Sequence, residues 1–387
     1  MGNRPKNIYS GYAFTGNPIV IVDDEPDFIG REAIYMLSIG DKEVYRGHYT
    51  LPLEANIAEL CAPYINYFSE ADCTDQTPAK EVLTGAALAA CTMRAEVSNE
   101  YIYQTVLLPG GISKEIFRKL AEAGTDIFIA RFLNHTRNFF FTLRGAGKIL
   151  NLPEDETGPM YYLIDQTCEI TISHDLDKSE FTVMAEPGVN AIDFGALRRY
   201  FANKHRVFPA VFHISIDRNP SITVVLQHSD PAACGHRLKY RNSLGVFDRF
   251  RLRMEPTVKL ENSEEYDSEI TPAVYNPITD DYTTIRAERT AKRKVWEVSV
   301  PVENAERLRL ICDMICSTEV YLETGSGTIA VIPTADTLEW EESGALLTEI
   351  KLTLTAVESD SRILPDDFAA LAGTQGVFTQ EFTEEFT

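Results

Sequence analysis

The sequence lacks long apolar runs. No stretch of about 18 consecutive apolar residues occurs, which predicts that no helix of the chain spans a membrane. The first residues, Met1-Gly-Asn-Arg-Pro-Lys6, contain no apolar core of a secretory signal. Lys6 also stands where an N-myristoylation pattern requires Ser or Thr. We therefore expect a chain with no signal peptide and no membrane insertion.

Positive charge is scarce. The 36 Lys and Arg residues face 58 Asp and Glu residues, which gives a formal net charge of -22 and a pI near 4.8. A nucleic-acid-binding protein needs a basic face that neutralises phosphates. A protein that docks on an anionic membrane surface needs a basic face as well. This balance predicts no nucleic-acid partner. It is typical of a well-solvated acidic surface.

Cysteine is sparse, and its number is odd. A framework of disulfides would need an even set at regular spacing, whereas dispersed single cysteines are typical of folding in a reducing cytoplasm. We therefore expect free thiols. The seven residues are Cys61, Cys73, Cys91, Cys168, Cys234, Cys312 and Cys316.

Motifs of nucleotide binding and nucleophilic catalysis are missing. Gly145-Ala-Gly147-Lys148 lacks both the six-residue frame of a phosphate loop and the Ser or Thr after the lysine, so it predicts a turn between strands. The sequence contains no Gly-x-Ser-x-Gly elbow and no His-Glu-x-x-His motif. Paired carboxylates of a polysaccharide hydrolase leave no signature in sequence, so that alternative stays open.

Metal-ligand spacing is also missing. Zinc sites need two ligand pairs, and a calcium loop needs a central Gly and a terminal Glu. We therefore predict no catalytic, cofactor-binding or metal-ligating residue, no cofactor and no enzymatic activity. The groups that come nearest to metal-site spacing are Cys312 with Cys316, His228 with Cys234 and His236, Asp175 with Asp177, and Asp23-Asp24-Glu25.

Short β-branched and aromatic runs dominate the chain. Several of them alternate apolar with polar residues, as half-buried strands do, and turn residues such as Asn17-Pro18 and Gly110-Gly111 separate them. The pattern predicts a mainly β fold. The expected strands cover 19–22, 34–39, 101–103, 139–143, 161–164, 222–226 and 350–355.

Few helices are expected. Ser113 can cap a helix that ends at Gly124, and Asp193 can cap a second helix. The third helix, at 302–317, has its first turn favoured by Glu303 and Glu306 through the helix dipole. Its predicted apolar stripe consists of Leu308, Ile311, Cys312 and Ile315.

A weak internal repeat organises the first two thirds of the chain. Strand, turn and short helix follow one another around Pro52 and again around Pro187, although chance similarity explains the likeness as well. With 387 residues, two or three cores are expected. We predict tandem β-sandwich modules followed by a β-barrel-like module with one flanking helix. The boundaries are 1–110, 111–240 (a connector helix and the second sandwich), 241–375, and an acidic aromatic tail at 376–387, frayed or donated as a strand to a neighbouring subunit.

Aromatic residues suggest one alternative function. Arg137-Asn-Phe-Phe-Phe-Thr-Leu143 and Tyr240-Arg-Asn-Ser-Leu-Gly-Val-Phe247 place Arg and Asn beside aromatic rings, as carbohydrate-binding surfaces do. Cross-strand aromatic pairs inside a sheet core explain the same pattern without a ligand. A carbohydrate-binding or adhesin module that contacts a cell-surface glycan therefore remains the alternative.

A succession of segments is more informative than any single motif. The segments are Phe14-Thr-Gly-Asn-Pro-Ile-Val-Ile21, Gly110-Gly-Ile-Ser-Lys-Glu115, Gly124-Thr-Asp-Ile-Phe128, Asn138-Phe-Phe-Phe-Thr142, Tyr240-Arg-Asn-Ser-Leu-Gly-Val-Phe-Asp-Arg-Phe250 and Ile311-Cys-Asp-Met-Ile-Cys-Ser-Thr-Glu-Val-Tyr-Leu322. This succession resembles uncharacterised β-rich proteins from the tail-gene regions of phages and prophages of Bacteroidetes, and the resemblance spans residues 14 to 355. Arg241 departs from that pattern, which often has Leu before the Asn.

The resemblance implies a virion structural protein of a bacteriophage tail, at the tail tip, the baseplate or the distal tail. Such a protein is assembled in the host cytoplasm and binds itself and other tail proteins. A homo-oligomeric ring built from repeated heterologous contacts is then expected. The resemblance carries over no active-site residue.

Overall fold

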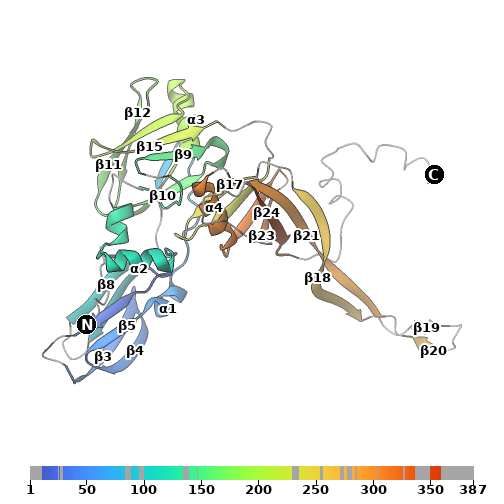
Figure 1. Ribbon diagram of the computed structural model, residues 1–387, viewed down its shortest axis with the longest axis horizontal. Helices are drawn as coiled ribbons and strands as arrows, with labels where there is room; N and C mark the ends of the chain where they lie inside the picture. Colours follow the sequence, from blue (N-terminus) through green and yellow to red (C-terminus); the bar gives the residue numbers. More distant parts are fainter. Residues whose placement is uncertain are drawn as a thin grey trace, which may run out of the picture. The chain divides into compact units, whose positions relative to one another are not determined.

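The computed structural model confirms the mainly β class, with 48% strand and 18% helix (Figure 1). It divides into two compact units, and each is described by itself. Unit 1 comprises 1–231, 240–249 and 309–317, and unit 2 comprises 232–239, 250–308 and 318–387. The predicted boundaries 1–110, 111–240 and 241–375 stay predictions. The structure describes residues 11–24, 26, 29–82, 89–95, 100–133, 139–145, 147–228, 235–252, 256–270, 274–276, 281–283, 286–302, 304–325, 327–335 and 349–358.

Unit 1 begins with a five-stranded sheet that faces a two-stranded sheet and a short helix. Alternation along β3 buries every second side chain, among them Tyr35 and Leu37. These side chains share one core with Ile21 and Cys61 from the opposite layer. The five-stranded sheet has the order β1 (Tyr12–Phe14), β8 (Glu100–Leu108), β7 (Ala89–Ala95), β3 (Glu32–Ile39) and β4 (Lys42–Thr50); opposite lie β2 (Val20–Asp23), β5 (Leu53–Asn56), α1 (Ala58–Cys61) and the 3-10 turn η2 (Ala62–Tyr64).

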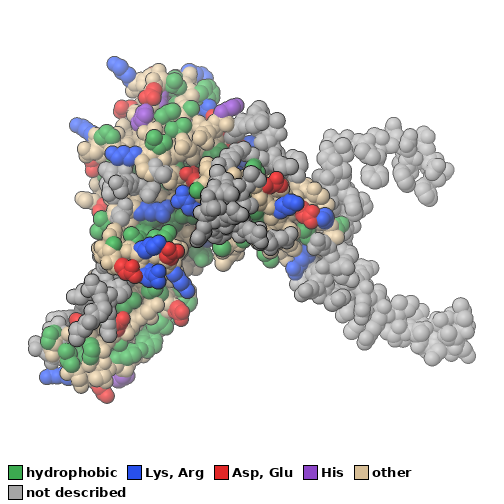
Figure 2. All heavy atoms as spheres, in the orientation of Figure 1, with side chains coloured by type: hydrophobic (Ala, Val, Ile, Leu, Met, Phe, Trp, Pro, Cys, Tyr) green, Lys and Arg blue, Asp and Glu red, His purple; other side chains and the backbone are tan. Residues whose placement is uncertain are grey.

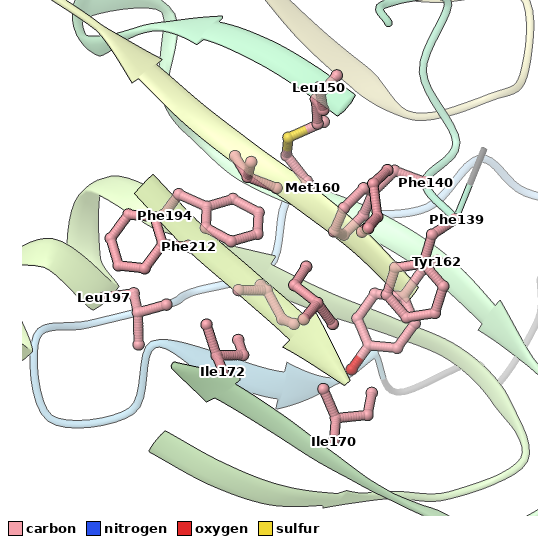
Figure 3. Close-up of a cluster of buried hydrophobic side chains, with 14 of the residues drawn as sticks. Phe139, Phe140, Leu150, Met160, Tyr162, Ile170, Ile172, Phe194, Leu197 and Phe212 are labelled. Carbon is pink, nitrogen blue, oxygen red and sulfur yellow. The ribbon is translucent and has the colours of Figure 1, made fainter. Parts of the chain in front are cut away.

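The second core of unit 1 lies among two further sheets and α3 (Phe194–His205). Its centre is aromatic: Phe139 stacks on Tyr162 with ring centroids 4.6 Å apart, and Phe140 meets Phe194 edge-on (Figure 3). One sheet has the order β10 (Pro159–Ile164), β13 (Gly188–Asp193) and β6 (Ala79–Glu81). The other has the order β12 (Glu180–Ala185), β11 (Cys168–Ser173), β14 (Val211–Ile216), β15 (Asn219–Gln227) and β9 (Ile149–Pro153).

Two predicted helices and their caps are confirmed in unit 1. The Ser113 hydroxyl accepts the N–H of Ile116 at the start of α2 (Lys114–Glu122), and Gly124 follows the helix at φ +66°. Asp193 caps α3 by accepting the N–H of Ala196 at 2.9 Å. The short π-helical turn η3 (Phe128–Phe132) and the 3-10 turn η4 (Glu154–Glu156) complete the unit.

The two segments of the predicted repeat share an order of elements. Around Pro52, β4 is followed by β5 and α1; around Pro187, β12 is followed by β13 and α3. Each turn thus leads into a second strand before the helix, a strand that the sequence analysis merged with the turn. Common origin of the two segments stays a prediction.

Unit 2 contains most of an open seven-stranded sheet. The order is β17 (Phe247–Arg251), β16 (Arg237–Arg241), β22 (Val320–Thr324), β23 (Gly327–Ala335), β24 (Glu349–Ala356), β21 (Arg286–Pro301) and β18 (Thr257–Ile270). The terminal strands β17 and β18 are not paired with each other within the described part of the chain, so the predicted barrel-like closure is not confirmed. The two edge strands of the sheet also differ in length, with five residues in β17 and 14 in β18.

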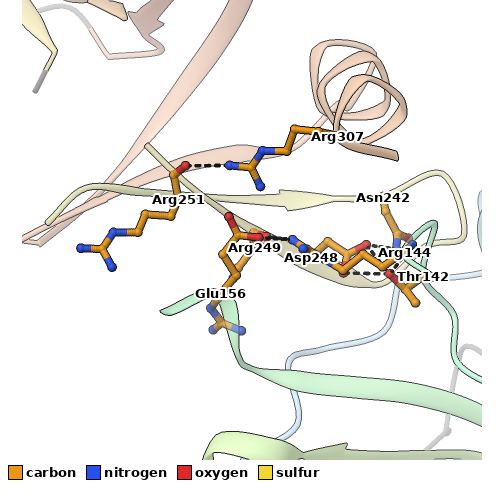
Figure 4. Close-up of polar contacts among 8 residues, drawn as sticks. All are labelled: Thr142, Arg144, Glu156, Asn242, Asp248, Arg249, Arg251 and Arg307. Carbon is orange, nitrogen blue, oxygen red and sulfur yellow. Dashed lines mark hydrogen bonds and ion pairs between the residues drawn. The ribbon is translucent and has the colours of Figure 1, made fainter. Parts of the chain in front are cut away.

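The predicted third helix is α4 (Ala305–Ile315), which begins where Asn304 accepts the N–H of Arg307 at 2.8 Å. Within unit 2, Arg307 also donates to the Arg251 carbonyl at 3.1 Å (Figure 4) and lies 3.4 Å from the Phe250 ring centroid. Glu303 lies outside the described residues.

The predicted apolar stripe of α4 is wrong in detail. The structure buries Leu310, Ile311 and Met314 and leaves Leu308, Cys312 and Ile315 half-buried. Apolar residues occur around much of this helix, so their spacing alone does not decide which of them are buried.

The two longest strands form a ribbon that continues beyond the sheet. β21 pairs with β24 only through Val295–Pro301, whereas its pairing with β18 continues to Arg286 opposite Ile270. We call 260–270 and 286–294 the ribbon. It is seen at β18 and β21 in Figure 1, with the short pair β19 (Val274–Asn276) and β20 (Asp281–Thr283) between its strands in sequence. The predicted tail at 376–387 lies outside the described residues.

Candidate functional site

Segments far apart in the sequence meet at one place in unit 1. The N–H of Gly16 donates to the Gly110 carbonyl at 2.8 Å, and the N–H of Gly111 donates to the Ser243 carbonyl at 2.6 Å. The N–H of Ser243 in turn donates to the Asp313 carboxylate at 3.1 Å. We call this place the loop junction: residues 14–17, 109–112, 141–144, 241–248 and 313–317. It gathers parts of five of the six segments on which the resemblance depends.

Two glycines allow the loops to come this close. Gly110 has φ +85°, and a Cβ there would lie 2.5 Å from the backbone carbon of Leu244. Gly245 has φ +88°, and its Cβ would lie 2.8 Å from the Pro109 carbonyl oxygen. Both the backbone conformation and the space therefore require glycine.

A buried carboxylate, Asp248, organises the polar side of the loop junction (Figure 4). The Asn242 amide donates to it at 2.8 Å, and the Thr142 hydroxyl donates at 3.4 Å. The same Asn242 amide donates to the Phe141 carbonyl, while its oxygen accepts the N–H of Leu244 at 3.0 Å. Burial raises the pKa of Asp248 above its ordinary value, although the charge of Arg144 and these hydrogen bonds oppose the rise.

Arg144 supplies the compensating charge. Its guanidinium lies 2.6 Å from the Glu156 carboxylate and also donates to the Arg249 carbonyl. Both side chains of the Arg144–Glu156 pair are at most 3% exposed. Burial lowers the pKa of Arg144, but the charges of Glu156 and Asp248 outweigh it, so the net pKa is raised and the side chain stays charged.

Asp313, on α4, is the second carboxylate of the junction. Burial raises its pKa to about 6; the N–H of Ser243 pulls the pKa down, and the charge of Asp248 pushes it up. The nearby Ser317 hydroxyl donates to the Arg241 carbonyl at 2.7 Å. The two carboxylates described at the loop junction, Asp248 and Asp313, thus accept hydrogen bonds from groups that belong to or bind the backbone loops. Such a hydrogen-bond network fixes the positions of the loops.

Arg241, the residue that departs from the resembling pattern, has a defined role here. Its guanidinium donates to the carbonyls of Phe68 and Gly245 at 3.0 and 3.1 Å. It also lies 4.0 Å from the centroid of the Phe247 ring. An arginine therefore fits this position through contacts that a leucine does not make.

A small hollow borders the junction. It has a cavity volume of about 10 Å³, is open to solvent, and is lined in part by Thr142, Arg144, Gly145 and Gly147. Ligand pockets for drug-sized molecules are larger, about 300–1,000 Å³. Gly145 and Gly147, with φ of +80° and +71°, form the predicted turn before β9, while Ala146 lies outside the described residues.

The candidate metal groups are dispersed. No group of three or more His, Cys, Asp or Glu side chains placed to hold a metal ion occurs among the described residues. Asp175 pairs with His213 at 3.0 Å, Asp177 accepts from Ser179, and His228 lies 3.4 Å from Glu154. Cys312 is half-buried and Cys316 exposed, as free thiols. Glu25 and Cys234 lie outside the described part of the chain.

The aromatic runs proposed for sugar binding belong to cores. Phe139, Phe140, Phe141 and Tyr240 are at most 2% exposed, and Phe247 is 9% exposed. Their rings are therefore not available for stacking on a glycan, and the core interpretation of these runs is confirmed. On the face in Figure 2, described acidic and basic side chains lie interspersed among apolar ones.

Sequence reasoning missed the two features that matter most. It did not single out Asp248 or Asn17, because Thr142 and Ile112, which they contact, lie 106 and 95 residues away. It also missed Glu156, whose partner Arg144 comes before a turn and β9 in the sequence. It also missed the strands of the ribbon. The signal there was charge: acidic residues gather in 261–269 and basic ones in 286–294.

Searches against known proteins add no family. No protein-family model matches the chain, and no curated protein matches it. None of the helices in the described part of the structure has the length and apolar character needed to cross a bilayer.

Proposed function

We propose that this chain is a structural protein of a bacteriophage tail, at the tail tip, baseplate or distal tail, and that its work is binding other protein subunits. The observation that carries the proposal is the ribbon, in which the nine-residue stretch 286–294 of β21 pairs with β18 alone among the described strands, through eight of its residues. At about 3.3 Å per residue, that part of the ribbon is roughly 30 Å long.

A ribbon of this kind is incomplete by itself. Isolated two-stranded hairpins are only marginally stable in water, and each strand presents a row of backbone N–H and C=O groups along its outer edge. Pairing with a strand of another subunit satisfies those groups. The loop junction is consistent with a structural role, because its described Arg241, Asn242 and Asp313 side chains bind backbone groups of loops in unit 1. The resemblance to phage tail-region proteins is the reason for proposing that the assembly is a phage tail.

Removal of the ribbon tests the proposal. Asn262 lies opposite Lys292 in the register, so residues 263–291 can be replaced by an Asn-Gly turn that closes a hairpin at that pair. We expect the full chain to form oligomers in light scattering or electron microscopy, or to be present in purified particles. The shortened chain should keep its circular dichroism and lose both properties. A full chain that is strictly monomeric and absent from particles contradicts the proposal.

A further inference from the structure

The two strands of the ribbon carry opposite charge. Residues 260–270 of β18 contain five acidic and no basic residues, a formal charge of -5. Residues 286–294 of β21 contain five basic residues and one acidic residue, a formal charge of +4. Such a basic segment is unusual in a chain whose net charge is -22. The acidic residues are Glu261, Glu264, Glu265, Asp267 and Glu269; the basic ones are Arg286, Arg289, Lys292, Arg293 and Lys294.

The register within one ribbon places residues of opposite charge at two opposed positions. The antiparallel register places Glu261 opposite Arg293 and Asp267 opposite Arg289. Opposite charges at directly opposed positions stabilise a sheet, and like charges destabilise it. Each strand also has a second, outer edge: among the described strands β18 stands at the end of the sheet order, and the pairing of β21 with β24 stops at Val295. The ribbon therefore has one acidic outer edge and one basic outer edge.

These edges select one way of joining two ribbons. Two β18 strands placed side by side bring acidic positions opposite acidic ones, and two β21 strands bring basic opposite basic. A β21 strand beside the β18 strand of another copy brings basic positions opposite acidic ones, and the antiparallel order of the ribbon simply continues. Only this third arrangement repeats the favourable pairing found inside the ribbon.

We propose that the ribbon is the self-assembly element of the chain: β21 of one copy pairs along 286–294 with β18 of a second copy along 260–270. This rests on the proposed function as a subunit-binding protein and names the partner as a second copy. The contact is heterologous, because different edges meet. It therefore repeats from copy to copy and generates a ring where the rotation closes and a filament where it does not.

A charge-exchanged full chain tests the proposal. It carries Glu261→Lys, Glu264→Lys, Glu265→Lys, Asp267→Lys and Glu269→Lys together with Arg286→Glu, Arg289→Glu, Lys292→Glu, Arg293→Glu and Lys294→Glu. Five changes of each sign leave the net charge of the chain unchanged, and the paired positions within the ribbon remain opposite in charge. The natural and exchanged chains should each assemble with themselves.

Mixing the two chains is the decisive measurement. Each contact of β21 with β18 between a natural and an exchanged chain opposes like charges, so co-capture through this pairing, by an affinity tag on one of them, should be about tenfold or more weaker than self-capture. Raising the salt from about 0.05 to about 0.5 M should reduce this discrimination, since exposed charges are screened. A tagged and an untagged natural chain provide the matched control for exchange of subunits.

The outcomes separate this inference from the proposed function. If natural and exchanged chains mix freely in the same oligomers, the proposed pairing of ribbon edges is wrong. The proposed function would then still hold, with assembly through another surface. A natural chain that is monomeric alone but present in particles overturns the second copy as partner and leaves binding to other tail proteins. An exchanged chain that folds but does not assemble with itself also contradicts the inference.

Discussion

The side-chain amide of Asn17 spans the backbone of Ile112 from both sides: its Nδ2 donates to the Ile112 carbonyl at 2.8 Å, and its Oδ1 accepts the Ile112 N–H at 2.9 Å. Asn17 is only 5% exposed, and Ile112 is half-buried. One side chain thereby ties the loop after β1 to the loop after β8, 95 residues away.

Replacement of Asn17 should destabilise unit 1. Asn17→Ala removes both hydrogen bonds and leaves the N–H and C=O of the half-buried Ile112 without this partner, which predicts a loss of about 1–2 kcal/mol in the free energy of unfolding. Urea unfolding followed by circular dichroism measures it. Asn219→Ala, at an exposed asparagine bonded to the Asp217 carbonyl, is the control and should change little.

Arg144→Ala should be among the most destabilising single changes at the loop junction. It leaves the buried carboxylates of Glu156 and Asp248 without their guanidinium, and breaking a buried ion pair in this way costs about 3–5 kcal/mol. The matched control is Arg46→Ala, since Arg46 and its partner Glu43 are each more than 40% exposed. An exposed pair of this kind contributes at most about 1 kcal/mol.

The double variant Arg144→Met with Glu156→Leu separates charge from packing. It removes both members of the pair and should be less destabilising than Arg144→Ala alone, because one buried carboxylate, Asp248, rather than two is left without the guanidinium. Thermal unfolding of Arg144→Ala, of the double variant and of Arg46→Ala ranks the three chains by stability. Equal stability of Arg144→Ala and Arg46→Ala would show that the buried pair does not hold the junction.

The raised pKa of Asp313 predicts that the free energy of unfolding depends on pH. Its pKa rises from an ordinary 3.8 in the unfolded chain to about 6 in the folded chain, through burial. Between about pH 4 and pH 6 the folded chain holds the proton more tightly, so the stabilisation from this group is complete below pH 4 and is lost as the pH rises.

Asp313→Asn should abolish this dependence while keeping an oxygen that accepts from Ser243. The free energy of unfolding of the variant relative to the natural chain should therefore improve by on the order of 2 kcal/mol from pH 4 to pH 7. Urea unfolding across that range checks it, with Asp175→Asn as the control at a carboxylate that is 74% exposed. A difference independent of pH contradicts the prediction.

The cysteines should differ in reactivity. Cys61 is fully buried, and burial raises the pKa of Cys168 and Cys73 to about 11, which depletes the reactive thiolate. Cys316 is exposed. Brief alkylation of the native chain followed by peptide mass spectrometry should find Cys316 modified well before Cys61 and Cys168. Labelling of all of them at one rate would mean that the cores open readily.

Local patterns predicted local structure well. Ser113 and Asp193 cap helices as expected, because a cap depends on residues within one turn. The mainly β class followed from alternation in strands such as β3. Closure of a barrel was not predictable, because it depends on which strands pair across long sequence distances.

The loop junction was beyond prediction for the same reason. The sequence analysis quoted the segments around Asn17, Gly110 and Asn242 but had no means of placing them together. Their contacts join residues about 100 positions apart, and a buried Asn or Asp looks in sequence like one in a solvated turn. The ribbon was missed for another reason: its high charge resembles a loop, although its two strands are antiparallel partners.

The face-to-face approach of Gly110 and Gly245 constrains how this protein can vary. A side chain at either position would collide with the main chain of the other loop, so neither site can be relieved by a change of rotamer. Homologous chains should therefore retain the two glycines together or lose them together, with the loop lengths altered at the same time. Such covariation would mark the boundary between close relatives and chains that only share the general architecture.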